Sequence, residues 1–170
     1  MTTLQARPLL VALIATCCTA PMMLLAAGYP KEGGIDTVEC MVAEGPRTES
    51  ATGVTFGGIV SHSVAHAPGG GHGPLDEYST YCVGHYLDAK SGKGLALGVC
   101  EQTDADGDKW VMRFRDEGNQ MTGTFEFVAG IGKYEDARIS GQYRPAGPMF
   151  FSASGRLQRC LYVTGSYRLK

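Results

Sequence analysis

Short segments in which apolar and polar residues alternate recur from about residue 36 to the C-terminus. Alternation with a period of two places every second side chain on the same face of a β-strand. Glycine, which occurs 24 times in the chain, divides these segments, and no amphipathic helix longer than two turns stands out between them. Short, evenly spaced strands separated by turn residues are typical of a β-sandwich or a β-barrel.

The candidate strands number eight or nine, which is enough to close a small antiparallel β-barrel. They cover residues 36–44, 52–64, 78–88, 94–103, 108–116, 121–129, 137–144 and 148–169, and the last is expected to divide into two. We therefore predict an all-β fold, a small closed antiparallel β-barrel of about eight strands. It forms a single domain over residues 36–170, preceded by a linker at residues 29–35.

Two neighbouring strands, 108–116 and 121–129, each place large apolar side chains on one face. The turn between them contains Gly118-Asn119, a pair typical of hairpins. The side chains expected inside the barrel are Trp110, Met112, Phe114, Phe125 and Phe127. For a barrel this small, a filled core is the expectation, and a lumen that binds a ligand is the alternative.

The N-terminal segment, residues 1–28, has the features of a signal peptide. Arg7 supplies the positive start, an apolar run of 20 residues follows, and small residues lead to a cleavage site after Gly28. An uncleaved membrane anchor is the alternative, because the run is long enough to span a bilayer. Lipid attachment at Cys17 or Cys18 is disfavoured by the residues that precede them. We predict export to the periplasm or the extracellular space, without membrane association after cleavage.

The predicted mature chain carries little net charge. Removing 28 of 170 residues leaves 142, and it removes only one charged side chain, Arg7, so that 14 basic and 17 acidic residues give a formal charge of −3. No basic patch stands out in the sequence, so we expect no nucleic-acid partner.

Four cysteines remain in the mature chain: Cys40, Cys82, Cys100 and Cys160. An even number in an exported chain favours two disulfides over a metal site or a catalytic thiol. Cys82 and Cys100 lie equally far from a turn centred near Ser91, so the hairpin sets them opposite each other at a Cα spacing of roughly 5.5 Å. Cys40 and Cys160 would then join the first and last strands. In the chain-entropy model, this disulfide would stabilise the folded state by roughly 4–5 kcal/mol, because it closes a long loop. Exchanged partners are the alternative.

The stretch TDADGDKW, residues 103–110, spaces three aspartates one residue apart. With Asp104 at position 1, an EF-hand loop requires glycine at position 6 and glutamate at position 12. The chain has Lys109 and Arg115 at those positions. Asp106-Gly107 between two alternating segments is instead a strong hairpin signal, because glycine accepts a positive φ. We predict a surface turn, with calcium binding as the alternative.

Four histidines raise the question of a metal site: His62, His66, His72 and His85. Along an extended strand His62 and His66 lie roughly 13 Å apart, too far to share an ion unless the chain bends. His85 shares one face of its hairpin with valines and leucines, and we expect it inside the barrel as a packed or hydrogen-bonded side chain. We assign no metal ligand, and metal handling by the segment 62–72 is a weaker alternative.

Residues 100–143 contain the segments CEQTDADGDKWVMRF and GTFEFVAGIGKYEDARISGQY. They resemble exported bacterial proteins of the allene oxide cyclase barrel-like group, related in fold to plant allene oxide cyclases and dirigent proteins. The positions that fit the group's pattern are Gly130, Gly132, Lys133, Tyr134, Gly141 and Tyr143, whereas Ala129, Ile131 and Ser140 depart from it. The resemblance covers about a third of the mature chain. It implies an allene oxide cyclase-like, or calycin-like, eight-stranded barrel that can hold an apolar cavity, and it carries over no catalytic residue.

Three functions are consistent with these features. The preferred one is an exported, disulfide-linked barrel without catalysis that binds a small apolar molecule or acts as an envelope or interaction module. The first alternative is an isomerase or cyclase with a sparse site inside the barrel, using polar groups such as His85, Tyr86 or Glu126, although Glu126 lies on the face opposite the phenylalanines. The second alternative is the metal handling described above. We predict no cofactor and assign no catalytic residue, because fold alone does not determine function.

Overall fold

The computed structural model describes residues 28–70, 73–89, 94–118 and 121–170. Within these ranges the chain forms ten β-strands and one short 3-10 helix. They are β1 (Glu32–Glu44), β2 (Arg47–Glu49), β3 (Val54–His66), β4 (Glu77–Ala89), β5 (Leu95–Asp104), β6 (Lys109–Glu117), β7 (Gly123–Gly130), η1 (Gly132–Tyr134), β8 (Arg138–Pro145), β9 (Phe150–Phe151) and β10 (Leu157–Arg168). Among the described residues no helix is long and apolar enough to cross a membrane.

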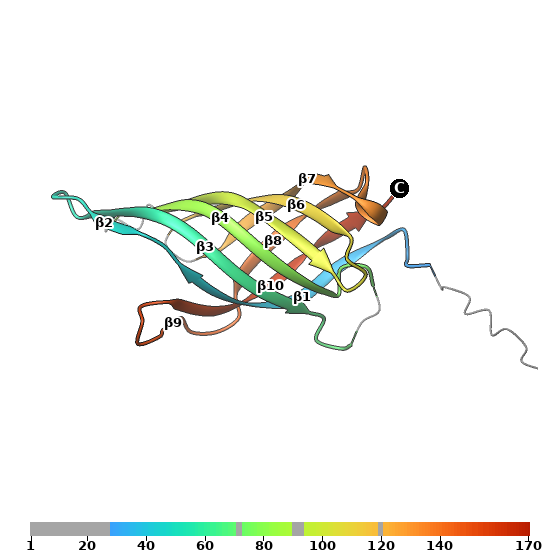
Figure 1. Cartoon of the computed structure of the whole chain (residues 1–170), viewed down its shortest axis with the longest axis horizontal. Helices are drawn as coiled ribbons and strands as arrows, with labels where there is room; N and C mark the ends of the chain where they lie inside the picture. The colour runs from blue at the N-terminus through green and yellow to red at the C-terminus, as the bar shows by residue number, and fades with distance from the viewer. Residues whose placement is uncertain (1–27, 71–72, 90–93, 119–120) are drawn as a thin grey trace, which may run out of the picture.

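Eight of these strands close into an antiparallel barrel (Figure 1). The order is β1-β10-β8-β7-β6-β5-β4-β3, and pairing of β3 with β1 completes the ring. The short strands β2 and β9 extend the sheet beside β3 and β10. Their hairpins project at one end of the barrel, whereas the C-terminus and the start of the described chain lie at the other (Figure 1). The prediction of an all-β closed barrel is therefore confirmed.

The strand predictions hold along most of the chain, with two differences at the start. Strand β1 begins at Glu32, inside the segment 29–35 that we predicted as a linker, and Glu32 pairs with Arg168. Gly33-Gly34 interrupts the alternation there and conceals the strand, although Ile35 is already buried. Strand β2 has no apolar residue, so it offers no alternation to detect. The predicted signal peptide lies outside the described residues, apart from Gly28.

Both predicted disulfides are present, and each joins residues that face each other in the sheet. Cys40 pairs with Cys160 across β1 and β10, and Cys82 pairs with Cys100 across β4 and β5. The Cα atoms are 4.0 Å apart in each pair, closer than the predicted 5.5 Å. That spacing fits the narrower of the two kinds of opposed residues in an antiparallel ladder.

The β4–β5 hairpin has the predicted register but turns the opposite face inward. Its valines and leucines lie on the outer surface, where Val83 is 39 %, Leu97 46 % and Val99 45 % exposed. The face that lines the lumen carries small residues and the Cys82–Cys100 disulfide, together with larger polar side chains such as Tyr86 and Gln102. A Cβ atom on Gly98 would lie only 2.6 Å from the Phe114 ring, so the inner wall must leave room for this aromatic side chain. Hydrophobicity alone therefore assigned the wrong face to this hairpin.

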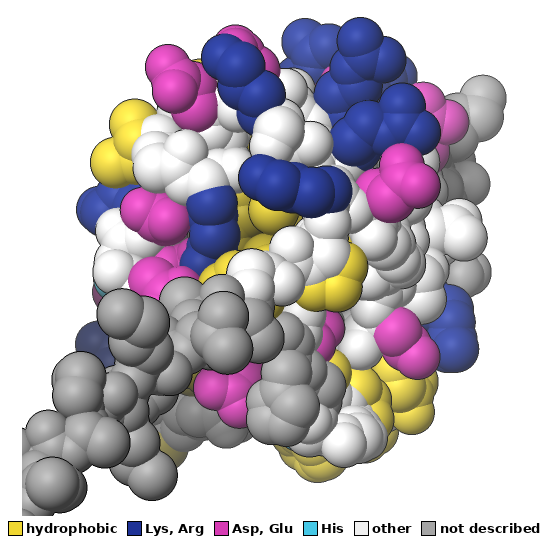
Figure 2. All heavy atoms as spheres, turned by 90° about the vertical axis from the view of Figure 1, so that its right-hand side faces the viewer, with side chains coloured by type: hydrophobic (Ala, Val, Ile, Leu, Met, Phe, Trp, Pro, Cys, Tyr) yellow, Lys and Arg dark blue, Asp and Glu magenta, His cyan; other side chains and the backbone are white. Residues whose placement is uncertain are grey.

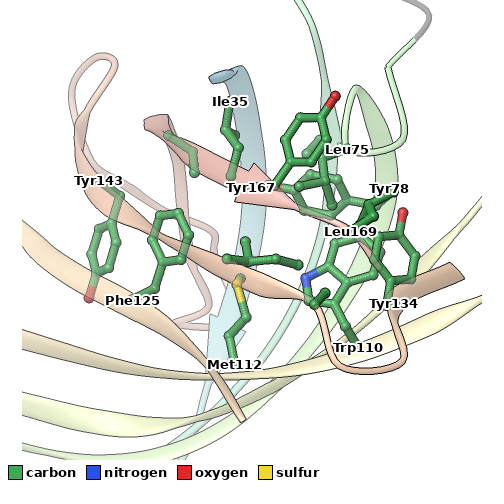
Figure 3. Close-up of a cluster of buried hydrophobic side chains, with 14 of the residues drawn as sticks. Ile35, Leu75, Tyr78, Trp110, Met112, Phe125, Tyr134, Tyr143, Tyr167 and Leu169 are labelled. Atoms are coloured by element: carbon green, nitrogen blue, oxygen red, sulfur yellow. The ribbon is translucent and has the colours of Figure 1, made fainter. Parts of the chain in front are cut away.

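The end of the barrel near the termini is filled by aromatic side chains (Figure 3). Trp110 and Tyr134 are almost fully buried, with ring centroids 4.3 Å apart, and Tyr78 contacts Trp110 edge to face at 5.4 Å. Leu75 and Leu169 pack into the same cluster. Such a cluster excludes water and stabilises the fold through burial and aromatic contacts. The interior is thus filled at this end, and any cavity must lie towards the other.

Candidate ligand-binding cavity

A cavity of about 480 Å³ occupies the other half of the barrel. This volume lies within the range of typical small-molecule sites. Its rim includes residues from the β1–β2 connection, the β6–β7 connection and the β9 hairpin, namely Gly45, Gly118, Met121, Met149 and Gly155. All these segments lie at the end of the barrel away from the termini, so the cavity opens there. The sequence left open whether the interior is filled or hollow. In the structure, the half near the termini is filled and the other half is hollow.

The wall of the cavity is mainly apolar and includes Met41, Met112, Leu161 and several aromatic rings, among them Phe114 and Phe125. Phe114 and Phe125 face each other across β6 and β7, and each ring lies over a strand position without a side chain. A Cβ atom would approach Phe114 to 2.6 Å at Gly98 and Phe125 to 2.5 Å at Gly141. These glycines let the rings lie against the wall, and the centre of the lumen stays open.

The floor of the cavity is polar and contains a carboxyl group. Glu39 points inward from β1 and accepts a hydrogen bond from the Ser63 hydroxyl on β3. Burial raises the pKa of the Glu39 carboxyl, and the hydrogen bond from Ser63 offsets part of this effect. Below the floor, the Tyr78 and Thr37 hydroxyls lie 3.4 Å apart. A weakly acidic carboxyl group therefore sits where the cavity meets the filled end.

A second carboxyl group lines the cavity nearer its mouth. Asp116 follows Trp110, Met112 and Phe114 on the inner face of β6, and burial raises its pKa to about 6. A Cβ atom on Gly123 would lie 2.5 Å from Asp116 Oδ1 and 2.6 Å from the Tyr143 hydroxyl, so these two oxygens converge over that glycine. Asp116 Oδ1 is buried and has no hydrogen-bond partner within the described part of the chain. The Asp116 carboxyl group therefore lies in the cavity wall with one oxygen unpaired.

The residues predicted to face the lumen divide into three groups. Met112, Phe114 and Phe125 line the cavity as expected. Trp110 belongs to the filled end, and Phe127 packs against the same core without lining the cavity. His85 does not face the lumen, because its side chain is exposed on the outer surface of β4. The prediction for His85 is wrong, since it followed from the reversed faces of the β4–β5 hairpin.

Of the other polar candidates, Tyr86 lines the cavity and Glu126 does not. Glu126 lies on the outer surface and forms an ion pair with Arg113 at 2.6 Å, as its place opposite the phenylalanines predicted. Sequence reasoning missed Glu39 and Asp116. The sequence did contain a feature that could have identified them, because each is an isolated acidic residue on the inward face of an alternating strand.

The histidine segment shows no metal site within the described residues. His62 and His66 are both exposed on the outer face of β3, and the His62 ring contacts Tyr81 with centroids 5.0 Å apart. His72 lies outside the described residues. In the part of the chain that the structure describes, no three or more histidine, cysteine or acidic side chains cluster in a way that could hold an ion.

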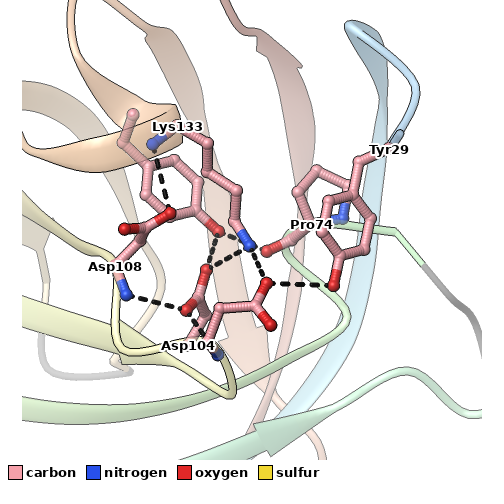
Figure 4. A network of polar contacts seen from close by, with 7 residues as sticks. Tyr29, Pro74, Asp104, Asp108 and Lys133 are labelled. Carbon is pink, nitrogen blue, oxygen red and sulfur yellow. Dashed lines mark hydrogen bonds and ion pairs between the residues drawn. The ribbon is translucent and has the colours of Figure 1, made fainter. Parts of the chain in front are cut away.

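The three aspartates form the predicted hairpin turn at the filled end of the barrel (Figure 4). Asp104 Oδ1 accepts hydrogen bonds from the backbone nitrogens of Asp106 at 2.9 Å and Asp108 at 3.0 Å, and Gly107 has a φ of +89°. The prediction of a surface position holds for Asp106, which is exposed, but not for Asp104, which is buried. Asp104 is buried because it bonds a lysine and a tyrosine from a distant part of the chain.

Lys133 lies beside these aspartates and forms ion pairs with two of them. Its Nζ lies 2.7 Å from Asp104 Oδ2 and 2.5 Å from Asp106 Oδ2. The Tyr134 hydroxyl donates a hydrogen bond to Asp104 Oδ2 at 2.9 Å and also contacts the carbonyl oxygen of Pro74. The Gly-Lys-Tyr motif of the resemblance therefore closes the filled end, and its role here is structural.

The surface at this end carries charges of both signs (Figure 2). Lys and Arg side chains gather in the upper part of that view, and Asp and Glu side chains lie beside them. Ion pairs join Arg168 to Glu32 at 3.0 Å and Lys170 to Asp136 at 2.8 Å. The charges are mixed and partly paired, and they do not form a field of one sign.

Comparison with known proteins gives a fold and no closer relationship. No protein-family model matches the chain, and no curated protein sequence is significantly similar to it. Among solved structures, the pterocarpan synthase dirigent protein PsPTS1 is similar in fold. The alignment covers 84 % of this chain and 97 % of the PsPTS1 chain, with a TM-score of 0.51 and 10 % sequence identity. The alignment with the pterocarpan synthase dirigent protein GePTS1 covers 84 % of this chain and 94 % of the GePTS1 chain, with a TM-score of 0.49 and 13 % sequence identity. The chain thus has the closed antiparallel barrel fold of dirigent proteins, consistent with the allene oxide cyclase-like resemblance of its sequence.

Proposed function

We propose that this protein is an exported barrel that binds a small, mainly apolar molecule in its lumen. The observation that carries the proposal is the cavity of about 480 Å³, open at one end and lined by apolar side chains with a few polar groups. Concave, mostly apolar sites with a few placed polar groups are typical of small-molecule binding. Two disulfides favour an oxidising compartment, in agreement with the signal peptide predicted from the sequence.

The wall and the floor of the cavity have different parts in this proposal. Phe114, Phe125 and Met112 offer a surface that is released from water when an apolar body covers it. Glu39 and Asp116 provide hydrogen bonds that orient a polar group on the ligand. The aromatic cluster fills the other end of the barrel, so a ligand would enter at the end where the β9 hairpin lies.

The uncharged fluorescent probe phenylnaphthylamine tests whether the lumen binds apolar molecules. Ala96 lines the cavity, and the side chain of its neighbour Leu97 points outward, so Ala96→Phe and Leu97→Phe form a matched pair. We expect saturable binding by the wild type and by Leu97→Phe, and binding at least about tenfold weaker by Ala96→Phe, whose ring occupies the lumen. Equal affinity of the two variants, or no binding by the wild type, would refute the proposal.

A second candidate function is acid catalysis inside the same cavity, such as an isomerisation or cyclisation. It is favoured by the raised pKa values of Glu39 and Asp116, because burial tunes carboxyl groups towards proton transfer near neutral pH. A screen of apolar epoxides and other strained substrates tests it, with product isomers resolved by chromatography. Conversion should fall in Glu39→Gln and Asp116→Asn while phenylnaphthylamine affinity is retained. Conversion that is unchanged in both variants excludes this candidate.

A further inference from the structure

A guanidinium group lies in the cavity and has no protein partner in the described residues. Arg159 points inward from β10, where it faces Met41 of β1 across the ladder, and both residues line the cavity. Its Nε is buried and makes no hydrogen bond with any described residue. Buried arginine is normally paired, because an unmade hydrogen bond of a charged donor is costly.

Three of the four acidic residues that line the cavity, Glu39, Glu44 and Asp116, have surroundings that do not include Arg159. Glu39 accepts its hydrogen bond from Ser63, and Glu44 at the rim forms an ion pair with Arg156 at 2.7 Å. The pKa of Asp116 is raised by burial, with no opposing effect of a nearby cation. If Arg159 lay beside that carboxylate, its charge would lower the pKa of Asp116. Arg159 therefore presents to the lumen a guanidinium group that has no hydrogen-bond or ion-pair partner among the described residues.

We propose that the ligand of this lumen is an organic anion, with an apolar body and a carboxylate or similar acidic group that binds Arg159. This inference rests on the proposed function, since it names the chemical class of the molecule that the cavity binds. The planar guanidinium presents its N–H groups in a fixed fork that matches a carboxylate, and such charge-assisted bonds are stronger than neutral ones. The anionic group would supply the guanidinium with the partner that it lacks among the described residues.

The position of Arg159 also orients the ligand. On the inner face of β10 it lies between Leu157 and Leu161, towards the end of the strand where β9 pairs and the cavity opens. An anionic group bound there lies near the mouth, and the apolar body extends inward along Phe114 and Phe125. The weakly acidic Glu39 at the floor then faces the far end of the molecule, so the two ends of the ligand meet groups of different chemistry.

Two probes with the same aromatic skeleton test this inference. Anilinonaphthalene sulfonate carries an anionic group, and phenylnaphthylamine has none. Arg159→Met removes the charge and keeps much of the side-chain length, and Arg159→Lys keeps the charge. Arg144→Met is the matched control, because Arg144 is exposed on the outer surface and lies over the Tyr162 ring at 4.4 Å.

We expect Arg159→Met to bind the sulfonate at least about tenfold more weakly than the wild type, as the loss of a charge-assisted contact implies. Its affinity for phenylnaphthylamine should change less than about twofold, which shows that the cavity is intact. Arg159→Lys should recover part of the sulfonate affinity, and Arg144→Met should match the wild type.

The possible failures are distinguishable. If neither probe binds the wild type, or if Ala96→Phe binds both as the wild type does, the proposed function fails and this inference fails with it. If both probes bind in the lumen but Arg159→Met weakens them equally or not at all, the lumen is a binding site without anion selectivity, and only the inference is overturned.

Discussion

Asp116 provides a quantitative test of how well the cavity is separated from solvent. The residue is 6 % exposed, and burial raises the pKa of its carboxyl group from 3.8 to about 6. At about 1.4 kcal/mol for each tenfold change in proton affinity, this rise corresponds to roughly 3 kcal/mol of destabilisation when the group is ionised. Water at the open mouth screens part of the effect, so we expect Asp116→Asn to stabilise the protein at neutral pH by about 1–3 kcal/mol.

The sign of the pH dependence follows from the direction of the shift. Because the pKa is higher in the folded state, the folded protein binds more protons than the unfolded chain between about pH 4 and pH 6. The contribution of Asp116 to stability is fully present below pH 3.8 and is lost as the pH rises through about 6. The free energy of unfolding of Asp116→Asn minus that of the wild type should therefore be near zero at acidic pH, rise across this window and level off above it.

Urea denaturation of both proteins at closely spaced pH values measures this difference directly. Glu39 titrates in the same direction in both proteins, so its contribution cancels. Asp106→Asn is a control of opposite sign, because the hydrogen bond from Lys133 lowers the pKa of the Asp106 carboxyl. That variant should be less stable than the wild type at neutral pH, with the difference fading as the pH falls. A pH-independent difference for Asp116→Asn would refute the conclusion that this carboxyl group is buried in the cavity wall.

Two further predictions concern the covalent and ionic links of the barrel. Lys133→Met should destabilise the protein by about 3 kcal/mol, because Asp104, whose side chain is 3 % exposed, loses its cation. Adding Asp104→Asn should recover part of the loss, and strictly additive effects in urea denaturation would contradict a direct pairing. Replacing Cys40 and Cys160 by serine should cost roughly 4–5 kcal/mol, and replacing Cys82 and Cys100 roughly 3 kcal/mol, because the loops span 120 and 18 residues. Denaturant midpoints of the two double variants in the reverse order would contradict this ranking.

The sequence allowed most of the strands, the register of the β4–β5 hairpin and both disulfides to be predicted, since these features depend on local alternation and on turn positions. The face of a strand is harder to predict when a barrel is partly hollow. In β4 and β5 the outer surface is richer in valine and leucine than the wall of the lumen, because the wall must leave room for Phe114. The assumption that the more apolar face lies inside placed His85 in the lumen, whereas it lies on the outer surface.

The division of the interior into a filled and an open half could not be predicted from the strand pattern. Trp110 comes from β6, Tyr78 from β4 and Tyr134 from η1, and only the assembled barrel brings their rings together. The same holds for the charged groups of the cavity. Glu39, Asp116 and Arg159 lie on three strands that are far apart in the sequence. Each occupies one of the positions of its own strand whose side chains point inward. An isolated charge on such a face is the signal to look for in similar chains.

The central claim is that the lumen binds a small molecule. Native mass spectrometry of the oxidised protein in the presence of phenylnaphthylamine tests this most directly, with the wild type, Ala96→Phe and Leu97→Phe measured side by side. We predict one bound probe per chain for the wild type and Leu97→Phe, and a loss of the bound form for Ala96→Phe. Equal loading of all three proteins, or no bound form of the wild type, would contradict the claim.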